Sequence, residues 1–185
     1  ASSPHAVCGQ LEKSGLVETL SQPQITDPFE IMRPGAVHNN IQLSKEQQSV
    51  VNTIQNTGKG FHPYLLHGIT GSGKTEVYLK LAQTTVEDGQ SVLVLVPEIS
   101  LTPQVANRFR SAFGSHVALW HSRMTKAEKG WTWQQLKKGE YSVVVGARSA
   151  IFAPLKNLGL IIVDEEQESS YKQENPAPRY HARDV

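Results

Sequence analysis

The segment YLLHGITGSGKTEVYL, from residue 64 to residue 79, limits the possible folds of this chain more than any other feature. Its central residues, Gly68–Thr75, match the pattern G-x-x-x-x-G-K-[ST], in which successive backbone N–H groups surround phosphate oxygens at the start of a helix. Leu65 and Leu66 precede the motif and a helical apolar pattern follows it, so we expect strand, loop and helix in that order. The sequence therefore predicts an α/β fold with a nucleotide phosphate site in this loop.

The residue types in the loop suit phosphate binding individually. Gly71 and Gly73 are able to adopt a positive φ and leave no Cβ in the way of the phosphates. We expect Lys74 to reach the β- and γ-phosphates of the nucleotide, and the Thr75 hydroxyl to complete the shell of a Mg²⁺ ion. A glycine-rich turn with a stray lysine is the alternative, which the surrounding strand and helix patterns disfavour. The loop residues predicted to bind the nucleotide, which the resemblance described below implies is ATP, are Gly68, Ile69, Thr70, Gly71, Ser72, Gly73, Lys74 and Thr75.

Helical and strand patterns alternate along the rest of the chain from residue 43. Capping boxes at Ser44 and Thr125 predict two helix starts, and Thr102 followed by Pro103 predicts a third. The alternation predicts a parallel sheet with helices on both faces and a ligand at the carboxyl ends of its strands. Apolar runs typical of buried parallel strands lie at residues 91–96, 116–120, 142–146 and 158–163.

Three acidic residues, Asp164, Glu165 and Glu166, directly follow the last of these strands. If that strand neighbours the strand before the phosphate loop, Asp164 lies beside the Mg²⁺ at Thr75 and holds it through water. Glu165 would then orient and deprotonate the attacking water. A solvated acidic strand end is the alternative. The predicted catalytic residues are therefore Lys74, Asp164 and Glu165, and the predicted metal-binding residues are Thr75 and Asp164.

The composition narrows the partners and the cellular compartment. Because 18 basic and 17 acidic residues give a net charge of +1, contacts with nucleic acid must come from local groups rather than from a global basic field. The single cysteine, Cys8, excludes an internal disulfide framework and a cysteine-based zinc site within this chain. With no signal peptide and no apolar run near membrane-spanning length, we predict a cytoplasmic protein without a membrane partner.

Beyond the loop and the acidic motif, the chain resembles the first motor lobe of the primosomal replication-restart helicases, which belong to superfamily 2. The resemblance covers residues 43–185 and implies a RecA-like P-loop NTPase lobe that binds ATP and Mg²⁺. It further implies hydrolysis that drives 3′-to-5′ DNA unwinding at stalled forks when a second lobe is present. The phrases that carry it are VPEISLTPQ at Val96–Gln104, VGARSAIFAP at Val145–Pro154, SYKQ at Ser170–Gln173 and RYHARD at Arg179–Asp184.

The resemblance also implies roles for residues outside the loop. Gln47 would contact the adenine side of the nucleotide, and residues at a helix start and after a strand would touch the DNA backbone. The segment Glu168–Arg183 would sense single-stranded DNA by stacking and charge and report to the ATP site, the alternative being a solvated surface loop. The residues implied in DNA binding or coupling are Thr102, Gln104, Arg148, Gln167, Tyr171, Lys172, Arg179, His181 and Arg183.

One position departs from the family pattern. The family has histidine after Asp-Glu-Glu, and this chain has Gln167. An amide can bridge the γ-phosphate region and the next motif by hydrogen bonds, but it cannot take up a proton. We therefore expect Gln167 to affect the coupling between the ATP site and the DNA-sensing segment rather than ATP binding.

The predicted domain organisation follows from this resemblance. Residues 1–31, which include a helix end with a glycine stop near Gly15, are expected to be the tail of a winged-helix domain or a mobile leader, and residues 32–42 a linker. Residues 43–185 are expected to be ATP-binding lobe 1, truncated at its C-terminus. We expect little turnover without a second lobe that supplies an arginine finger, and zinc only in the missing part of the full-length protein.

The implied partners are forked DNA with single-stranded and double-stranded junctions, primosome proteins and single-stranded-DNA-binding protein, in the bacterial cytosol with the nucleoid. Another superfamily-2 DNA translocase, or a non-catalytic module that docks DNA or replication proteins, is the alternative. A P-loop kinase or GTPase is disfavoured because the chain has no Asn-Lys-x-Asp motif, and because Glu165 beside Asp164 is unlike a small-molecule kinase.

Overall fold

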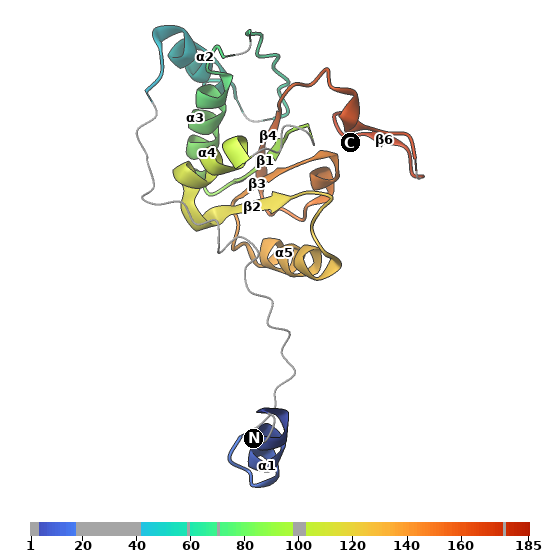
Figure 1. Ribbon diagram of the computed structural model, residues 1–185. Coiled ribbons are helices and arrows are strands. Elements are labelled where there is room, and N and C mark those ends of the chain that lie inside the picture. The colour runs from blue at the N-terminus through green and yellow to red at the C-terminus, as the bar shows by residue number, and fades with distance from the viewer. Residues whose placement is uncertain (1–3, 18–41, 59, 70, 98–102, 176) are drawn as a thin grey trace.

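Four parallel strands form the central sheet of the computed structural model, which describes residues 4–17, 42–58, 60–69, 71–97, 103–175 and 177–185 (Figure 1). Their spatial order is β2-β3-β1-β4, and every neighbouring pair is parallel. The predicted parallel sheet is thus confirmed, with strand ends within one residue of those expected. The strands are β1 Ser91–Leu95, β2 Val117–Trp120, β3 Val143–Gly146 and β4 Leu158–Val163.

Helices cover both faces of the sheet. The chain moves outward from β1 through α4 to the edge strand β2, and then back inward through α5 to β3. Because such crossovers are right-handed, α4 and α5 lie on opposite faces, and Figure 1 shows α5 beyond β2 and apart from α3 and α4. The helices of this lobe are α2 Lys45–Gln55, α3 Lys74–Glu87, α4 Pro103–Phe113 and α5 Lys126–Lys138.

Local signals in the sequence set the helix starts. The side chain of Ser44 accepts a hydrogen bond from the Gln47 N–H, and the Gln47 side chain accepts one from the Ser44 N–H, so the predicted capping box is present. Thr125 and Glu128 form the same arrangement at the start of α5. The helix α4 begins at Pro103, as predicted. None of the described helices is long and apolar enough to cross a membrane.

The core lies between the sheet and its helices, and its centre is β1. Every residue of β1 is buried, as expected for a strand that is apolar on both faces and has a neighbour on each side. The edge strand β4 differs from the prediction of a buried strand. Its Ile162 is buried, whereas Leu158 and Ile161 are 44% and 46% exposed. The physical reason is that β4 pairs only with β1 among the described residues.

The predicted strand before the phosphate loop is wrong for this structure. Residues 61–69 form neither strand nor helix, and the Leu65 side chain is 78% exposed. The apolar run is only two residues long and follows Pro63, which has no N–H to donate to a ladder. Strand preference depends on pairing and packing with neighbours rather than on the residues alone. Among the described residues, the phosphate loop therefore leads into α3 without a strand of the sheet before it.

Two further segments complete the described chain. The helix α1, Pro4–Lys13, stands apart from the sheet in Figure 1 and is followed by Gly15 with φ 69°, so the predicted glycine stop is present. Residues 18–41 lie outside the described part of the chain, so the winged-helix and linker assignments stay predictions. After β4, the expected loop at 168–183 contains a short antiparallel hairpin. It is formed by β5 Lys172–Gln173 and β6 Tyr180–His181.

Candidate ATP site and DNA-facing hairpin

The glycines of the phosphate loop adopt the backbone conformation that the sequence predicts. Gly71 and Gly73 have φ values of 81° and 80°, which L side chains rarely adopt. Gly73 is the N-cap of α3, and no described side chain caps this helix start. The Glu76 N–H donates to the Gly73 carbonyl oxygen at 3.0 Å, so the N–H groups before it, at the positive end of the helix dipole, are the ones suited to an anion.

Lys74 lies over this loop. Its Nζ donates a hydrogen bond to the carbonyl oxygen of Gly68 at 2.7 Å and makes a longer contact of 3.5 Å with that of Ile69. A Cβ at Gly68 would lie 2.6 Å from Ser72 Oγ, so a larger residue there would force the Ser72 side chain to move. The ammonium is thus held at the rim of the loop by neutral carbonyl groups, from which a phosphate oxygen would attract it more strongly.

Gln47 connects α2 to the loop. Its Nε2 donates hydrogen bonds to the carbonyl oxygens of Ser72 at 3.3 Å and Gly73 at 3.2 Å. Its Oε1 meanwhile accepts the Ser44 N–H at 2.8 Å. Sequence reasoning placed Gln47 near the nucleotide but missed these loop contacts. Contact with adenine stays a prediction.

Asp164 lies at the end of β4, beside the first turns of α3. Its N–H donates to the Leu95 carbonyl oxygen at 2.9 Å, and its Oδ1 accepts a hydrogen bond from the Tyr78 hydroxyl at 3.2 Å. Burial raises the pKa of Asp164, and the charge of Glu165 adds to this, while the Tyr78 hydrogen bond and the Lys74 charge oppose it. Burial, followed by the Asp164 charge, also raises the pKa of Tyr78, so the phenol remains a donor.

Tyr78 is a site residue that the sequence analysis missed. Its ring occupies an apolar position of the α3 pattern and packs against the core, which hides the role of its hydroxyl. The sequence feature that indicates Tyr78 as a site residue is its spacing from Lys74. Tyr78 follows Lys74 by four residues, and residues four apart on a helix share a face.

The acidic turn after Asp164 has an uncommon backbone. Glu165 has φ 49°, in the left-handed region that residues with a Cβ enter at a cost of about 1–3 kcal/mol. Its Oε2 accepts a hydrogen bond from Gln167 Nε2 at 2.8 Å. The residue that departs from the family pattern therefore contacts the predicted general base directly.

Tyr171 is buried, with 0% of its surface exposed. Its hydroxyl donates toward the carbonyl oxygens of Asp164 at 2.5 Å and Leu95 at 3.1 Å. Burial raises the pKa of Tyr171, and the charges of Asp164 and Glu165 act in the same direction. The idea that Tyr171 stacks on DNA bases is wrong for this conformation, because the ring is covered. A coupling role stays a prediction.

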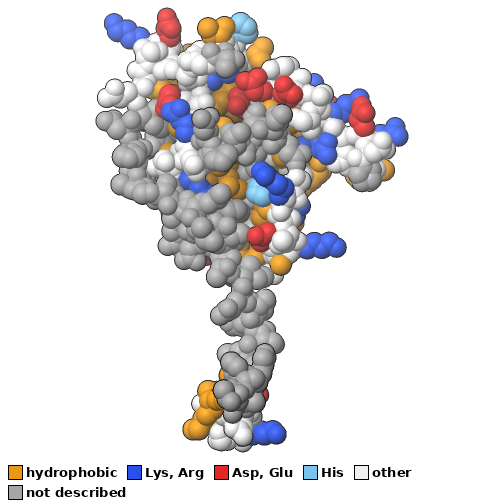
Figure 2. All heavy atoms as spheres, in the orientation of Figure 1, with side chains coloured by type: hydrophobic (Ala, Val, Ile, Leu, Met, Phe, Trp, Pro, Cys, Tyr) orange, Lys and Arg blue, Asp and Glu red, His pale blue; other side chains and the backbone are white. Residues whose placement is uncertain are grey.

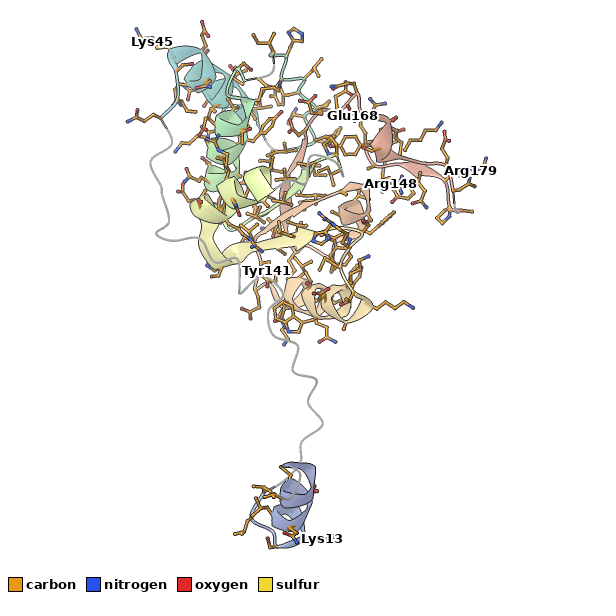
Figure 3. The ribbon with its side chains drawn as sticks, in the orientation of Figure 1. Lys13, Lys45, Tyr141, Arg148, Glu168 and Arg179 are labelled. Carbon is orange, nitrogen blue, oxygen red and sulfur yellow. The ribbon has the colours of Figure 1, made fainter. Side chains whose placement is uncertain are left out.

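Arg148 joins the end of β3 to the hairpin. It begins the short 3₁₀ turn η4, Arg148–Phe152, and its Nη1 donates to the carbonyl oxygens of Lys172 at 2.6 Å and Ser170 at 3.4 Å. The guanidinium carbon lies 5.7 Å from the centre of the Tyr180 ring. Figure 3 shows Arg148 near the base of the hairpin and Arg179 at its outer end. Arg148, which the sequence analysis assigns to the DNA backbone, therefore binds the backbone of the hairpin in this structure.

The hairpin carries an open groove of about 650 Å³. One of its basic side chains, Lys172, contacts Glu174 at 2.9 Å, and Arg183, which lies outside the groove, contacts Glu166 at 2.9 Å. Figure 2 shows Lys and Arg side chains gathered over this part of the molecule. The groove residues are Lys172, Gln173, Glu174, Asn175, Arg179, Tyr180, His181 and Asp184.

The predicted residues thus form two groups. Gln47, Lys74 and Asp164 meet around the phosphate loop, whereas Arg148 and the basic residues after it meet around the hairpin. Thr70 and Thr102 lie outside the described residues, and Gln104 is placed only by its backbone in the first turn of α4.

The donor set near the loop suits magnesium. Thr75 and Asp164 offer a hydroxyl and a carboxylate, and Mg²⁺ prefers such oxygen ligands together with phosphates and water. Within the described ranges, no group of three or more His, Cys, Asp or Glu residues could hold a metal ion. With two protein oxygen ligands, the other positions of a Mg²⁺ ion would be filled by phosphate oxygens and water.

Comparison with known proteins agrees with this geometry. Relatives described as replication restart protein PriA come from Synechocystis sp., Bacillus subtilis and Chlamydia pneumoniae. The Synechocystis protein is 58% identical over 127 residues, which cover 69% of this chain. The Bacillus subtilis protein is 52% identical over 145 residues, or 77% of this chain, and the Chlamydia pneumoniae protein is 42% identical over 179 residues, or 95%. The chain spans only 15%, 18% and 24% of the length of these three relatives.

A solved structure and a protein family also match. The UvsW helicase from bacteriophage T4 aligns with a TM-score of 0.52 and 17% identity over 90% of this chain and 61% of that one, which supports the RecA-like α/β fold. Residues 44–185 match the family described as DEAD/DEAH box helicase. Since this match covers most of the chain and includes both the phosphate loop and the acidic turn, the chain belongs to the DEAD/DEAH box helicase family.

Proposed function

We propose that this chain is the ATP-binding lobe of a DNA helicase that acts in replication restart. The observation that carries the proposal is the contact between Asp164 and Tyr78 at 3.2 Å, because it brings the acidic turn to the helix that follows the phosphate loop. A phosphate loop beside an acid at a strand end is the arrangement that positions a nucleoside triphosphate and its metal. The similarity to PriA relatives supports the assignment to replication restart.

ATP binding would require two exchanges of hydrogen bonds in the loop. The Ser72 N–H would exchange the Ile69 carbonyl oxygen, at 3.1 Å, for a phosphate oxygen, and Lys74 would exchange its carbonyl contact with Gly68 for the β- and γ-phosphate oxygens. Gln47 would reach the adenine side while its backbone stays in α2. Thr75 and Asp164 would hold Mg²⁺, which when bound neutralises negative charge on the phosphates.

Hydrolysis would depend on Glu165. Its carboxylate would orient a water molecule toward the γ-phosphate and take up the proton that the water releases. Gln167 fixes that carboxylate by its hydrogen bond at 2.8 Å, so the amide would select the orientation of the base rather than carry a proton.

DNA would bind along the hairpin and the nearby strand ends. The basic groups at Lys172, Arg179, His181 and Arg183 suit phosphate contacts, which position DNA without reading its sequence. Arg148, which follows β3, would extend this path, and Thr102 and Gln104 would add further backbone contacts to the DNA. The buried hydroxyl of Tyr171 would connect the hairpin with the acidic turn, because it contacts the Asp164 carbonyl.

The expected substrate is forked DNA, unwound in the 3′-to-5′ direction with a second lobe present. Primosome proteins and single-stranded-DNA-binding protein are the expected partners, in the bacterial cytosol with the nucleoid. Zinc is expected only in parts of the natural protein beyond these residues.

A strand-displacement assay with the natural full-length protein tests this function. Forked duplexes that carry a single-stranded tail of either polarity are incubated with ATP and Mg²⁺, and Glu165→Gln serves as the control that retains the site but lacks its base. We expect displacement on one polarity only, and none with Glu165→Gln. Displacement that persists in Glu165→Gln, or that needs no ATP, would exclude the function.

A further inference from the structure

Two phenol groups from separate elements hold Asp164 at two different points. Tyr78, in α3, donates to the carboxylate oxygen Oδ1 at 3.2 Å. Tyr171, in the 3₁₀ turn η5 Ser169–Tyr171, donates to the backbone carbonyl oxygen of Asp164 at 2.5 Å. The side chain and the backbone of one acidic residue are therefore fixed independently.

The backbone contacts leave only side-chain rotation free. Asp164 donates its N–H to Leu95, and Tyr171 occupies its carbonyl oxygen, so the main chain is fixed on both sides of Cα. The carboxylate would still be able to rotate among its χ1 and χ2 wells. The Tyr78 hydroxyl favours one of these orientations by donating to Oδ1, and the Glu165 N–H also bonds the carboxylate, so these two donors together limit its rotation.

Tyr78 is itself fixed with respect to the phosphate loop. It follows Lys74 by four residues in α3, so both lie on one face of the helix, and its ring packs against the hydrophobic core. The distance between the acid and the loop is therefore set by one rigid helix. A side chain with the same ring but no hydroxyl would keep the packing and lose the orientation.

We propose that Tyr78 is a positioning residue that orients the Asp164 carboxylate for the magnesium ion bound with ATP. This inference rests on the proposed function, because it concerns the metal of the same site. Partners of this kind, which bind a metal ligand rather than the metal, commonly change metal affinity by about 10–100-fold when removed.

The test is Mn²⁺ binding to the natural full-length protein saturated with a non-hydrolysable ATP analogue, followed by the EPR signal of free Mn²⁺. We expect Tyr78→Phe to weaken Mn²⁺ binding by about tenfold. Tyr141→Phe is the matched control, because Tyr141 is 5% exposed and lies in the core beside Trp131 of α5, away from the acidic turn. Its Mn²⁺ affinity should equal that of the wild type.

Kinetics provide a second measurement. In ATP turnover, Tyr78→Phe should raise the Mg²⁺ concentration for half-maximal rate by about the same tenfold, and excess Mg²⁺ should restore most of the maximal rate. A residue that only stabilised the fold would lower the maximal rate without moving this midpoint. Tyr78→Met, which also fills apolar space without a donor, replaces Tyr78→Phe if that variant does not fold.

The possible results distinguish the positioning role of Tyr78 from the proposed function of the site. Wild-type Mn²⁺ affinity and Mg²⁺ midpoint in a folded Tyr78 variant would overturn the positioning role while leaving the proposed function intact. If the wild-type protein with the nucleotide analogue binds no Mn²⁺ at all, the proposed function itself fails. Equal weakening in Tyr78→Phe and Tyr141→Phe would assign the effect to general loss of packing and would also overturn the positioning role.

Discussion

The side-chain amide of Gln47 donates a hydrogen bond to the carbonyl oxygen of Gly73 at 3.2 Å, across 26 residues of sequence. The same side chain completes the capping box of α2 by accepting the Ser44 N–H. One residue thus stabilises a helix start and restrains the loop that would receive the phosphates.

Replacing Gln47 with alanine should affect both roles. Loss of the capping contact should lower the free energy of unfolding by about 1 kcal/mol, and loss of the loop contact should weaken ATP binding. Ser44→Ala separates the two, because it removes the cap and keeps the Gln47 amide on the loop. Titration with a fluorescent ATP analogue should show weaker binding for Gln47→Ala only, and equal affinities in both variants would contradict the loop role.

The left-handed backbone at Gly73 predicts a steric effect. Gly73→Ala forces a Cβ into a conformation with φ 80° and toward Gln47 Nε2, so it should destabilise the protein by more than about 1 kcal/mol and weaken nucleotide binding. Gly130→Ala in α5 is the control, because an added Cβ there meets open space. In denaturant unfolding that control should be up to about 1 kcal/mol more stable than the wild type. A Gly73→Ala variant as stable as the control would show that the loop does not need this conformation.

Replacing Asp164 with a neutral amide should stabilise the protein by an amount that depends on pH. Burial raises the pKa of Asp164 above its ordinary value of 3.8, so the unfolded chain ionises first as pH rises. The contribution of protonated Asp164 to the free energy of unfolding is fully present below pH 3.8. It is lost as pH rises through the pKa of Asp164 in the folded protein, where the buried carboxylate becomes charged. Asp164→Asn should therefore be more stable than wild type at neutral pH and lose this advantage in acid.

Glu174→Gln is the control for this experiment, because the pKa of Glu174 is shifted in the opposite direction to that of Asp164. The Lys172 ammonium lowers the pKa of the exposed Glu174 carboxylate, so removal of that charge should give no gain at neutral pH. Chemical denaturation of both variants between pH 3 and pH 7 checks the prediction. An Asp164→Asn advantage that grows in acid would contradict it.

The contacts of Arg148 predict how the hairpin responds to substitution. Arg148→Lys should lose the Tyr180 stacking and the planar donor geometry, so the hairpin should become more sensitive to limited proteolysis. If Arg148 also touches a DNA phosphate, Arg148→Ala should lower the salt slope of single-strand binding by about 0.7. Arg123→Ala, at an exposed turn after β2, is the control. Unchanged proteolysis and an unchanged slope would exclude both roles for Arg148.

Much of the fold could be predicted because its signals are local. The capping boxes at Ser44 and Thr125 and the apolar runs of β1 to β4 each lie within a few residues. The phosphate loop was recognisable because glycines at fixed positions permit left-handed backbone, as Gly71 and Gly73 show.

The remaining features depend on contacts between distant residues. A strand at Leu65 would need a paired neighbour, and burial of Tyr171 depends on β1 and the acidic turn lying next to it. Tyrosine is hard to assign from sequence because its ring packs while its hydroxyl seeks a partner. For the same reason the sequence places Tyr78 among the apolar positions of α3 and gives no sign of its contact with Asp164.

ATP turnover by the natural full-length protein, with and without forked DNA, tests the central claim most directly. Lys74→Ala is the matched variant, because it removes the ammonium from the loop while the loop glycines remain. We predict that forked DNA strongly raises turnover in the wild type and that Lys74→Ala abolishes it. Turnover that ignores DNA, or that survives the loss of Lys74, would contradict an ATP-driven helicase lobe at this site.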